Sequence, residues 1–321
     1  MTDVTISDIE LARDRIASSV RRTPLWFNHT LSERLRTSVY LKYELFQKTG
    51  SFKVRGAFNK ALSVEPEARG RGFVAVSGGN HAQAVAYVGA KLGIPAIIVM
   101  PETTPRNYVE ATRGYGAQVV FAKDAAEAFE RVASYEAEGW VAIHPFDDPL
   151  VIAGQGTVGL EILENVPHIT DLIVSIGGGG FIGGVATAIK AKKPGVRIWG
   201  VETTGADAMA RALAQGQPVQ MPAITSIART LGAPSVSART FAMAQRYLES
   251  VTVVEDSEAV AACELLLERA KVLTEPAASC TLAAADRLRD RFSPDSHLVL
   301  VLCGGNVSLE DLCRFRGQVG N

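Results

Sequence analysis

The stretch LIVSIGGGGFIGGVATAI, residues 172–189, contains no charged residue and decides the fold. Its 18 residues reach the lower length limit of a membrane-spanning helix, and Gly179 and Gly183 have the small-xxx-small spacing of helix pairs in lipid. However, each of the four consecutive glycines at 177–180 would weaken a helix by about 1 kcal/mol relative to alanine. We therefore interpret the stretch as a buried strand, a glycine loop and a helix.

The same order, a short apolar run followed by a segment of helical periodicity, recurs along the chain. Continuous apolar runs such as Ile97–Met100 are typical of strands buried on both faces, and their alternation with helices predicts an α/β protein with parallel-rich sheets. The N-terminus is expected to begin with a helix, because Ser7 and Glu10 have capping-box spacing and Ile9, Leu11, Ile16 and Val20 give an apolar face. The predicted strands are 73–76, 96–100, 118–122, 141–144, 172–176, 197–201, 251–254 and 298–302; the predicted helices include 82–92, 125–137, 158–165, 182–192, 257–270 and 277–291.

The composition excludes several classes of protein. The 321 residues carry 33 Lys and Arg against 34 Asp and Glu. The near-zero net charge argues against binding to nucleic acid or to an anionic membrane surface by electrostatic attraction. A hydrophobic content of 47% is too high for a disordered chain, and the length predicts about two domains. The four cysteines form no CxxC pair and the N-terminus lacks a secretion signal, so we expect reduced thiols and a cytoplasmic protein.

Three loops rich in Gly, Ser and Asn directly follow predicted strands: SGGNH at 77–81, GGGG at 177–180 and CGGN at 303–306. Ligands of open parallel sheets bind outside the carboxyl ends of the strands, so these loops are the first candidates for a site. The four glycines allow backbone N–H groups to converge on an anion at the start of a helix, which predicts a phosphate site. Residues 77–81 also precede a helix, where their amides, with Ser77 and Asn80, could hold a carboxylate.

The glycine loop supports a second interpretation. Gly178, Gly180 and Gly183 satisfy GxGxxG after a strand, and Glu202 lies about 20 residues further on, as in dinucleotide-binding folds. Under this alternative the protein is a nicotinamide-dependent oxidoreductase.

Lys53 stands at an unusual place for a lysine. Ser51 is the expected N-cap of a helix with apolar positions at Val54, Ala57 and Phe58, which puts Lys53 in the first turn. A cation there is unfavourable to the helix dipole. The position therefore favours a lysine held for chemistry, such as a Schiff-base amine.

Taken together, the motifs resemble the fold-type II pyridoxal-phosphate (PLP) enzymes, in particular threonine/serine dehydratases and serine racemase. The resemblance implies a two-domain, tryptophan synthase β-like fold, with residues 1–69 and 146–321 forming a large cofactor-binding domain and residues 70–145 a small substrate-side domain. It also implies a homodimer. The similarity runs over nearly the whole chain in the motifs SFKVRGA (51–57), SGGNH (77–81), GQGT (154–157), GGGG (177–180), EP (275–276) and CGGN (303–306).

The resemblance also implies roles for single residues. Lys53 is the catalytic residue and joins the cofactor covalently, Phe52 packs against the cofactor ring, and Asn80 hydrogen-bonds the ring's phenolic oxygen. The phosphate is held by Gly177, Gly178, Gly179 and Gly180, and Glu275 and Cys303 complete the cofactor site, with Cys303 beside the pyridine nitrogen. The substrate carboxylate is cradled by Ser77, Gly78, Gly79, Asn80 and His81.

The implied reaction removes water and ammonia from a small β-hydroxy amino acid, L-threonine or L-serine, and gives a 2-oxo acid. A thiol at Cys303 is a weak donor to the pyridine nitrogen, which favours elimination. Dehydratases for phenylserine or 3-hydroxyaspartate, serine racemase, a β-replacement synthase and a non-catalytic amino-acid sensor remain alternatives on the same fold.

Some positions depart from the family pattern. Gly78 replaces a serine that acts as acid and base in serine racemase, so racemisation is not the expected main activity. Glu202 matches the first carboxylate of a divalent-cation site (Mg²⁺ or Ca²⁺) and Ala206 offers a carbonyl, but Ala208 stands where a second carboxylate is expected. Arg229 replaces an acid near the substrate side, which indicates either an acidic or aryl substrate group or a surface arginine.

Biosynthetic threonine dehydratases add a regulatory domain after the catalytic part. The sequence stops soon after Cys313, so no isoleucine feedback is expected.

Overall fold

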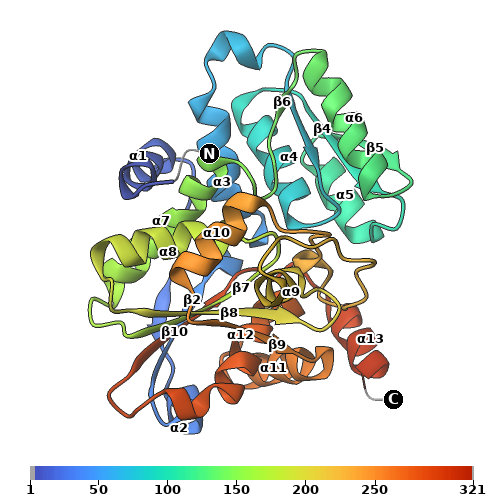
Figure 1. The fold of residues 1–321 in the computed structure, drawn as a ribbon. Coiled ribbons are helices and arrows are strands. Elements are labelled where there is room, and N and C mark those ends of the chain that lie inside the picture. Colours follow the sequence, from blue (N-terminus) through green and yellow to red (C-terminus); the bar gives the residue numbers. More distant parts are fainter. Residues whose placement is uncertain (1–3, 320–321) are drawn as a thin grey trace.

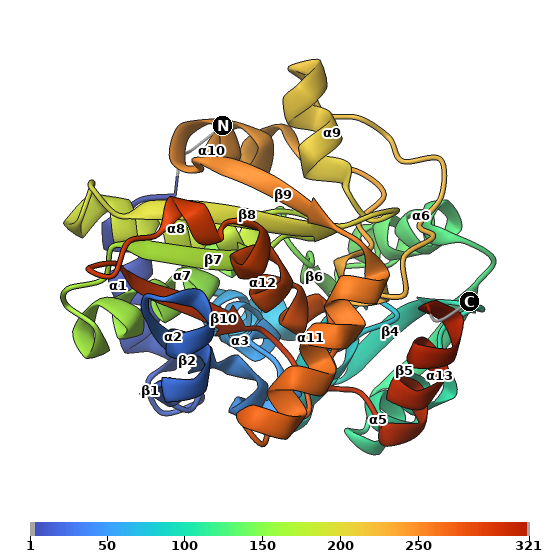
Figure 2. The same cartoon turned by 90° about the horizontal axis from the view of Figure 1, so that it is seen from below.

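The computed structural model describes residues 4–319, in which the strands form two sheets (Figures 1 and 2). The larger sheet has the order β1-β2-β10-β7-β8-β9 and the smaller has the order β5-β4-β3-β6. All strand pairs are parallel except β1 with β2. The strands are β1 Leu25–Phe27, β2 Ser38–Tyr43, β3 Phe73–Val76, β4 Ala96–Pro101, β5 Gln118–Ala122, β6 Val141–Ala142, β7 Asp171–Ser175, β8 Arg197–Thr203, β9 Ser250–Val254 and β10 His297–Leu302.

Helices cover both sheets, which confirms the predicted α/β class. In Figure 1 the smaller sheet lies at the top with α4, α5 and α6 against it, and the larger sheet lies below, between α7 and α8 on one side and α11 and α12 on the other. Whether the two sheets mark separate domains with the predicted borders stays a prediction. The helices are α1 Ile6–Ile16, α2 His29–Leu35, α3 Lys53–Ser63, α4 Asn80–Leu92, α5 Arg106–Gly114, α6 Ala125–Ala137, α7 Pro149–Asn165, α8 Gly180–Lys192, α9 Ala208–Gln215, α10 Ala238–Tyr247, α11 Asp256–Arg269, α12 Pro276–Arg287 and α13 Leu309–Val319.

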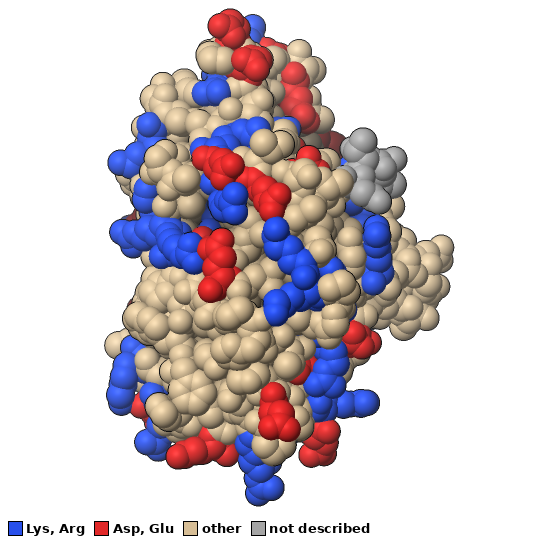
Figure 3. Space-filling model, turned by 90° about the vertical axis from the view of Figure 1, so that its left-hand side faces the viewer, with Lys and Arg blue, Asp and Glu red and all other residues tan. Residues whose placement is uncertain are grey.

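The uncharged stretch 172–189 has the predicted form. Its first part belongs to strand β7, and its second part belongs to helix α8 after a loop of glycines. Within residues 4–319, no helix combines the length and apolar character that crossing a bilayer requires. On the face shown in Figure 3, basic and acidic side chains are interspersed, and neither sign forms a continuous field.

The predicted cap of the first helix is wrong. Thr5 and Asp8 form the capping box of α1, not Ser7 and Glu10. Ile9 and Ile16 are buried as predicted, but Leu11 is 60% exposed. The helix therefore turns a slightly different face to the core, because Ala12 takes the third inward position.

A buried network of charges joins strand β2 to helices α3 and α7. Arg55 on α3 is 1% exposed and makes ion pairs with Glu44 at 2.8 Å and Glu161 at 2.6 Å. Lys42 on β2 is fully buried and pairs with the same Glu161. Each ionised group thus has an opposite charge and hydrogen bonds at close range, which offsets the cost of taking it out of water.

Replacing Arg55 tests this network. Arg55→Met leaves Glu44 and Glu161 with less compensation in a buried setting, so we expect the free energy of unfolding to fall by about 3–5 kcal/mol. Urea denaturation measures this free energy of unfolding. Arg34→Met is the matched control, because the Arg34–Asp286 pair is partly exposed and is expected to contribute at most about 1 kcal/mol. Equal losses in the two variants would contradict the prediction.

Candidate active site

The start of α3 is fixed to the end of β10. Ser51 forms an isolated antiparallel bridge with Gly304, and Phe52 N donates to the backbone oxygen of Cys303 at 3.2 Å. Phe52, rather than the predicted Ser51, is the N-cap, and Lys53 is the first residue of the helix. Two distant motifs of the sequence therefore meet at one point.

The amine of Lys53 is buried within this junction. Its Nζ donates a hydrogen bond to the backbone oxygen of Pro145 at 2.7 Å. Burial lowers the pKa of Lys53 to about 8, although Cys303 and Glu275 act in the opposite direction. The amine is thus much closer to its neutral form at physiological pH than an exposed lysine.

Glu275 lies beside the amine and is held by neutral donors. Asn80 Nδ2 donates to its two carboxylate oxygens at 2.8 and 3.1 Å, and Thr230 Oγ1 donates to one of them at 3.0 Å. Burial raises the pKa of Glu275 to about 7. Asn306 Nδ2 in turn donates to Asn80 Oδ1 at 2.7 Å, which fixes the orientation of the Asn80 amide.

The four glycines form a tight turn between β7 and α8. Gly179 has φ +88° and is the N-cap of α8, with no side chain of the described residues bonded to the cap. A Cβ on Gly178 would clash with the ring of Phe146, and a Cβ on Gly180 would clash with the backbone oxygen of Phe146. The free backbone N–H groups at this helix start are suited to an anion.

The loop 77–81, half-buried at its first three residues and buried at Asn80 and His81, leads into α4. Gly79 N donates to Ser77 Oγ at 3.1 Å, and Gly79 is the N-cap of α4. His81 Nε2 lies 2.8 Å from the backbone oxygen of Ile143, to which it must donate, so Nδ1 is the acceptor nitrogen. That Nδ1 is buried and finds no partner among residues 4–319, and burial lowers the pKa of His81 to about 3.

Cys303 and Phe52 lie at the same junction. Ser175 Oγ donates to Cys303 Sγ at 3.4 Å, and burial raises the pKa of the Cys303 thiol to about 12, so it stays neutral. Phe52 stacks on Phe181, with ring centroids 3.8 Å apart. Its predicted packing against a cofactor stays a prediction.

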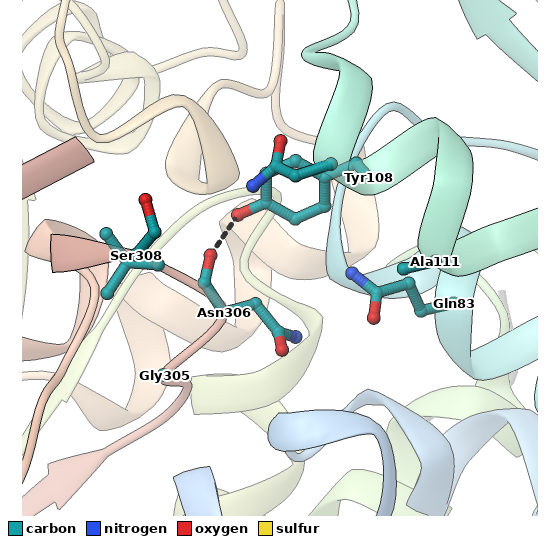
Figure 4. A pocket seen from close by; sticks show the side chains of 8 residues that line it. Gln83, Tyr108, Ala111, Gly305, Asn306 and Ser308 are labelled. Carbon is teal, nitrogen blue, oxygen red and sulfur yellow. Dashed lines mark hydrogen bonds between the residues drawn. The ribbon is translucent and has the colours of Figure 1, made fainter. Parts of the chain in front are cut away.

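A pocket of about 280 Å³ adjoins these residues (Figure 4). Gln83 enters it from α4, Tyr108 and Ala111 from α5, and Asn306 from the segment after β10. Tyr108 donates from its hydroxyl to the backbone oxygen of Asn306 at 2.8 Å, and this is the dashed bond of Figure 4. The pocket lies near the Asn80–Glu275 pair, because Asn306 both lines the pocket and donates to Asn80.

The structure does not support the predicted cation site. Both carboxylate oxygens of Glu202 accept backbone N–H groups, from Met209 at 2.9 Å and Ala210 at 2.8 Å, and the side chain is fully buried. Ala206 lies nearby in a bridge with Thr203. The part of the chain that is described has no group of three or more His, Cys, Asp or Glu side chains arranged to hold a metal. Because Glu202 is buried and both of its oxygens are hydrogen-bonded to the backbone, it is also not placed to bind the ribose of a dinucleotide.

Sequence reasoning missed several residues of the site. Pro145 and Phe146 contact Lys53 and the glycine loop from an irregular segment outside any motif, and Thr230, next to the Arg229 noted above, contacts Glu275 from a short 3-10 helix, Arg229–Leu231. Gly304 and Asn306, which also contribute to the site, lie in the CGGN loop that the sequence analysis proposed as part of it.

A lysine amine with a lowered pKa, a glycine turn at one helix start and a glycine-containing loop at another lie at the ends of parallel strands, an arrangement typical of enzymes that act on small molecules. The chain belongs to the pyridoxal-phosphate dependent enzyme family, whose model matches residues 16–304. It is 42% identical to L-threonine ammonia-lyase of Geobacter sulfurreducens, over 95% of this chain and 76% of that protein. Maize serine racemase has a TM-score of 0.92 at 37% identity, covering 99% of this chain and 98% of the other. The T.th. threonine deaminase has a TM-score of 0.89 at 38% identity, covering 95% of this chain and 99% of the other.

The residues present fit the family's cofactor. The aldehyde of PLP needs an amine with a lowered pKa, which Lys53 provides, and its phosphate needs a helix start free of side chains, which 177–180 provide. Buried polar atoms without a partner in the described chain also gather here, at Ser51 Oγ and His81 Nδ1. A bound polar molecule would satisfy such atoms.

Adding one methyl group to the glycine turn tests the phosphate cradle. Gly180→Ala places a Cβ against the backbone of Phe146, so we expect PLP binding to weaken at least about tenfold. Absorbance titration of the cofactor-free protein with PLP measures the change, and circular dichroism checks the fold. Gly195→Ala is the control, because no atom lies within 4 Å of its Cβ. Equal affinities in the two variants would contradict the assignment.

The lowered pKa of Lys53 predicts a pH dependence for cofactor capture. Only the neutral amine reacts with an aldehyde, so the rate of PLP incorporation is expected to rise through the pKa of about 8 and then level off. Between about pH 6.5 and about pH 8.5 the rate should rise roughly tenfold or more. Stopped-flow absorbance of the cofactor-free protein measures it. A rate that keeps rising to the ordinary lysine pKa would show that the amine is not perturbed.

Proposed function

We propose that this chain is a PLP-dependent ammonia-lyase that removes water and ammonia from a small β-hydroxy amino acid and forms a 2-oxo acid. L-Threonine and L-serine are the first substrates. The observation that carries the proposal is the Lys53 amine with its lowered pKa: it bonds to Pro145, whose neighbour Phe146 packs against the glycine turn, and the half-buried loop 77–81 is held nearby through Asn80 and Glu275. The names of the similar proteins, a threonine ammonia-lyase and a threonine deaminase, support this choice.

Bound PLP supplies the electron sink for the reaction. In our assignment the glycines 177–180 and the start of α8 hold its phosphate, and Lys53 anchors it covalently. Asn80, Glu275 and Cys303 line the ring, since all three are buried around the Lys53 amine.

Lys53 Nζ is the general base in this proposal. A pKa of about 8 lets the freed amine take a proton from the α-carbon near neutral pH and release it afterwards. The Pro145 oxygen keeps the amine oriented through its hydrogen bond. The loop 77–81 binds the substrate carboxylate through backbone N–H groups, which positions the α-carbon toward Nζ.

Cys303 and Gly78 favour elimination over racemisation. The Cys303 thiol is neutral and places no negative charge beside the ring, so it stabilises a protonated pyridine nitrogen only weakly. Gly78 has no side chain that could return a proton to the substrate. Loss of the β-hydroxyl is then the easier outcome.

We also propose the finer features that the resemblance suggests, a homodimer and a cytoplasmic location. The four cysteines support a reducing compartment, because all are free thiols and Cys263, Cys280 and Cys303 are buried. Glu202 is assigned no cation in this proposal.

Lys53 provides the decisive test. Lys53→Ala is expected to lower the formation of 2-oxobutanoate from L-threonine by at least about a thousandfold, because the variant loses both the base and the anchor. Lys91→Ala, at an exposed position of α4, is the control. The wild-type protein should be yellow, and borohydride should attach the cofactor to the peptide that contains residue 53. Turnover retained by Lys53→Ala, or a label on another lysine, would refute the proposal.

A further inference from the structure

Thr104 lies next to the substrate loop, although no motif of the sequence includes it. Strands β3 and β4 are parallel neighbours in register, with Val76 opposite Val99, and Ser77 N donates to the backbone oxygen of Val99 at 3.1 Å. The segments that follow these two strands therefore leave the sheet side by side. Thr104 lies in the segment after β4, where its N–H donates to the backbone oxygen of Pro101 at 2.9 Å.

The side chain of Thr104 occupies the space that Gly78 leaves. A Cβ built on Gly78 would lie 2.6 Å from Thr104 Oγ1, closer than real Cβ atoms approach any neighbour. Glycine at 78 and threonine at 104 are thus complementary in shape. The hydroxyl of Thr104 stands where a side chain of the loop itself would begin.

This hydroxyl lacks the partner that a comparable threonine has. Thr230 flanks the same loop, with its methyl group 3.3 Å from a Cβ on Gly79, and its hydroxyl donates to Glu275. Thr104 Oγ1 is buried and has no hydrogen bond within residues 4–319. A buried hydroxyl without a partner is costly, so such an atom at the edge of a binding loop points to a ligand.

We propose that Thr104 is a substrate-binding residue whose hydroxyl donates a hydrogen bond to the α-carboxylate of the amino acid in the loop 77–81. It supplies, from the segment after β4, the side-chain donor that Gly78 cannot supply from within the loop. The inference rests on the proposed function only in taking an amino acid bound to the PLP form as the ligand.

Binding of an unreactive amino acid tests the proposal without turnover. L-Alanine has no leaving group at Cβ, so the absorbance change of the PLP-loaded protein reports binding alone. Thr104→Val keeps the shape and removes the hydroxyl, and we expect the Kd for L-alanine to rise about tenfold, while Thr104→Ser stays within about threefold of the wild type. Thr103→Val, at an exposed neighbouring position, is the control. A Kd for Thr104→Val within twofold of the control overturns the proposal.

L-Alaninamide identifies the atom that Thr104 contacts. This ligand lacks the carboxylate, so the tenfold penalty of Thr104→Val should shrink to less than about threefold. An equal penalty for the amide and the acid overturns the assignment to the carboxylate. If the wild type binds L-alanine but forms no 2-oxo acid from L-threonine or L-serine, the proposed function fails while these measurements still decide the role of Thr104.

Moving the hydroxyl from residue 104 to residue 78 distinguishes a role in substrate binding from a purely structural role. Thr104→Ala should raise the Kd for L-alanine about tenfold, and Gly78→Ser in the same variant places a hydroxyl in the vacated space. We expect the double variant to recover to within about threefold of the wild type, whereas Gly78→Ser alone should bind poorly because of the clash with Thr104. A double variant no better than Thr104→Ala would count against the proposal.

Discussion

The bridge between Ser51 and Gly304 is the contact on which the site depends. Together with the bond from Phe52 N to the Cys303 oxygen, it ties the start of helix α3 to the end of β10, so that Lys53 lies close enough to Glu275 and Cys303 to feel their charges. The bridge acts at Ser51, just before the N-cap of α3, and the buried pairs of Arg55 act two residues after Lys53, within the first turn of the same helix. The amine is therefore held from both sides of its own backbone, which allows it to stay buried in a position that the helix dipole disfavours.

The sequence predicted best where one local pattern decides the structure. The strand, glycine loop and helix of 171–192 followed from the cost of four glycines in a helix, and the choice of the three loops as site candidates followed from the rule that ligands bind at the carboxyl ends of parallel strands. The N-terminal cap was mistaken because Thr5/Asp8 and Ser7/Glu10 offer the same capping-box spacing two residues apart. The choice between the two pairs depends on tertiary packing, in which Ile9, Ala12 and Ile16 are buried.

The rest could not be predicted because it depends on contacts between distant segments. Strand β2 contains Lys42 and is followed by Glu44; in the sequence both have the character of solvated charges, yet both are fully buried and paired. Pro145 and Thr104 come to the site from irregular segments and Thr230 from a short 3-10 helix, each through a backbone oxygen or a hydroxyl. Neither periodicity nor a motif reports such atoms, and only the fold brings them to Lys53, Glu275 and Gly78.

Glu202 and Glu275 show how their surroundings give two buried carboxylates different roles. Burial raises the pKa of both, to about 8 and about 7. Both carboxylate oxygens of Glu202 accept hydrogen bonds from the backbone N–H groups of Met209 and Ala210, so Glu202 on β8 caps helix α9. A metal ion bound to Glu202 would have to replace these hydrogen bonds. Glu275 is itself the N-cap residue of α12, yet its carboxylate makes no cap bond and turns to Asn80, Thr230 and the amine of Lys53. Burial moves the pKa values of Glu275 and Lys53 toward each other, the carboxyl group's upward to about 7 and the amine's downward to about 8. That near balance, which burial creates, is what an enzyme that must take and return a proton requires.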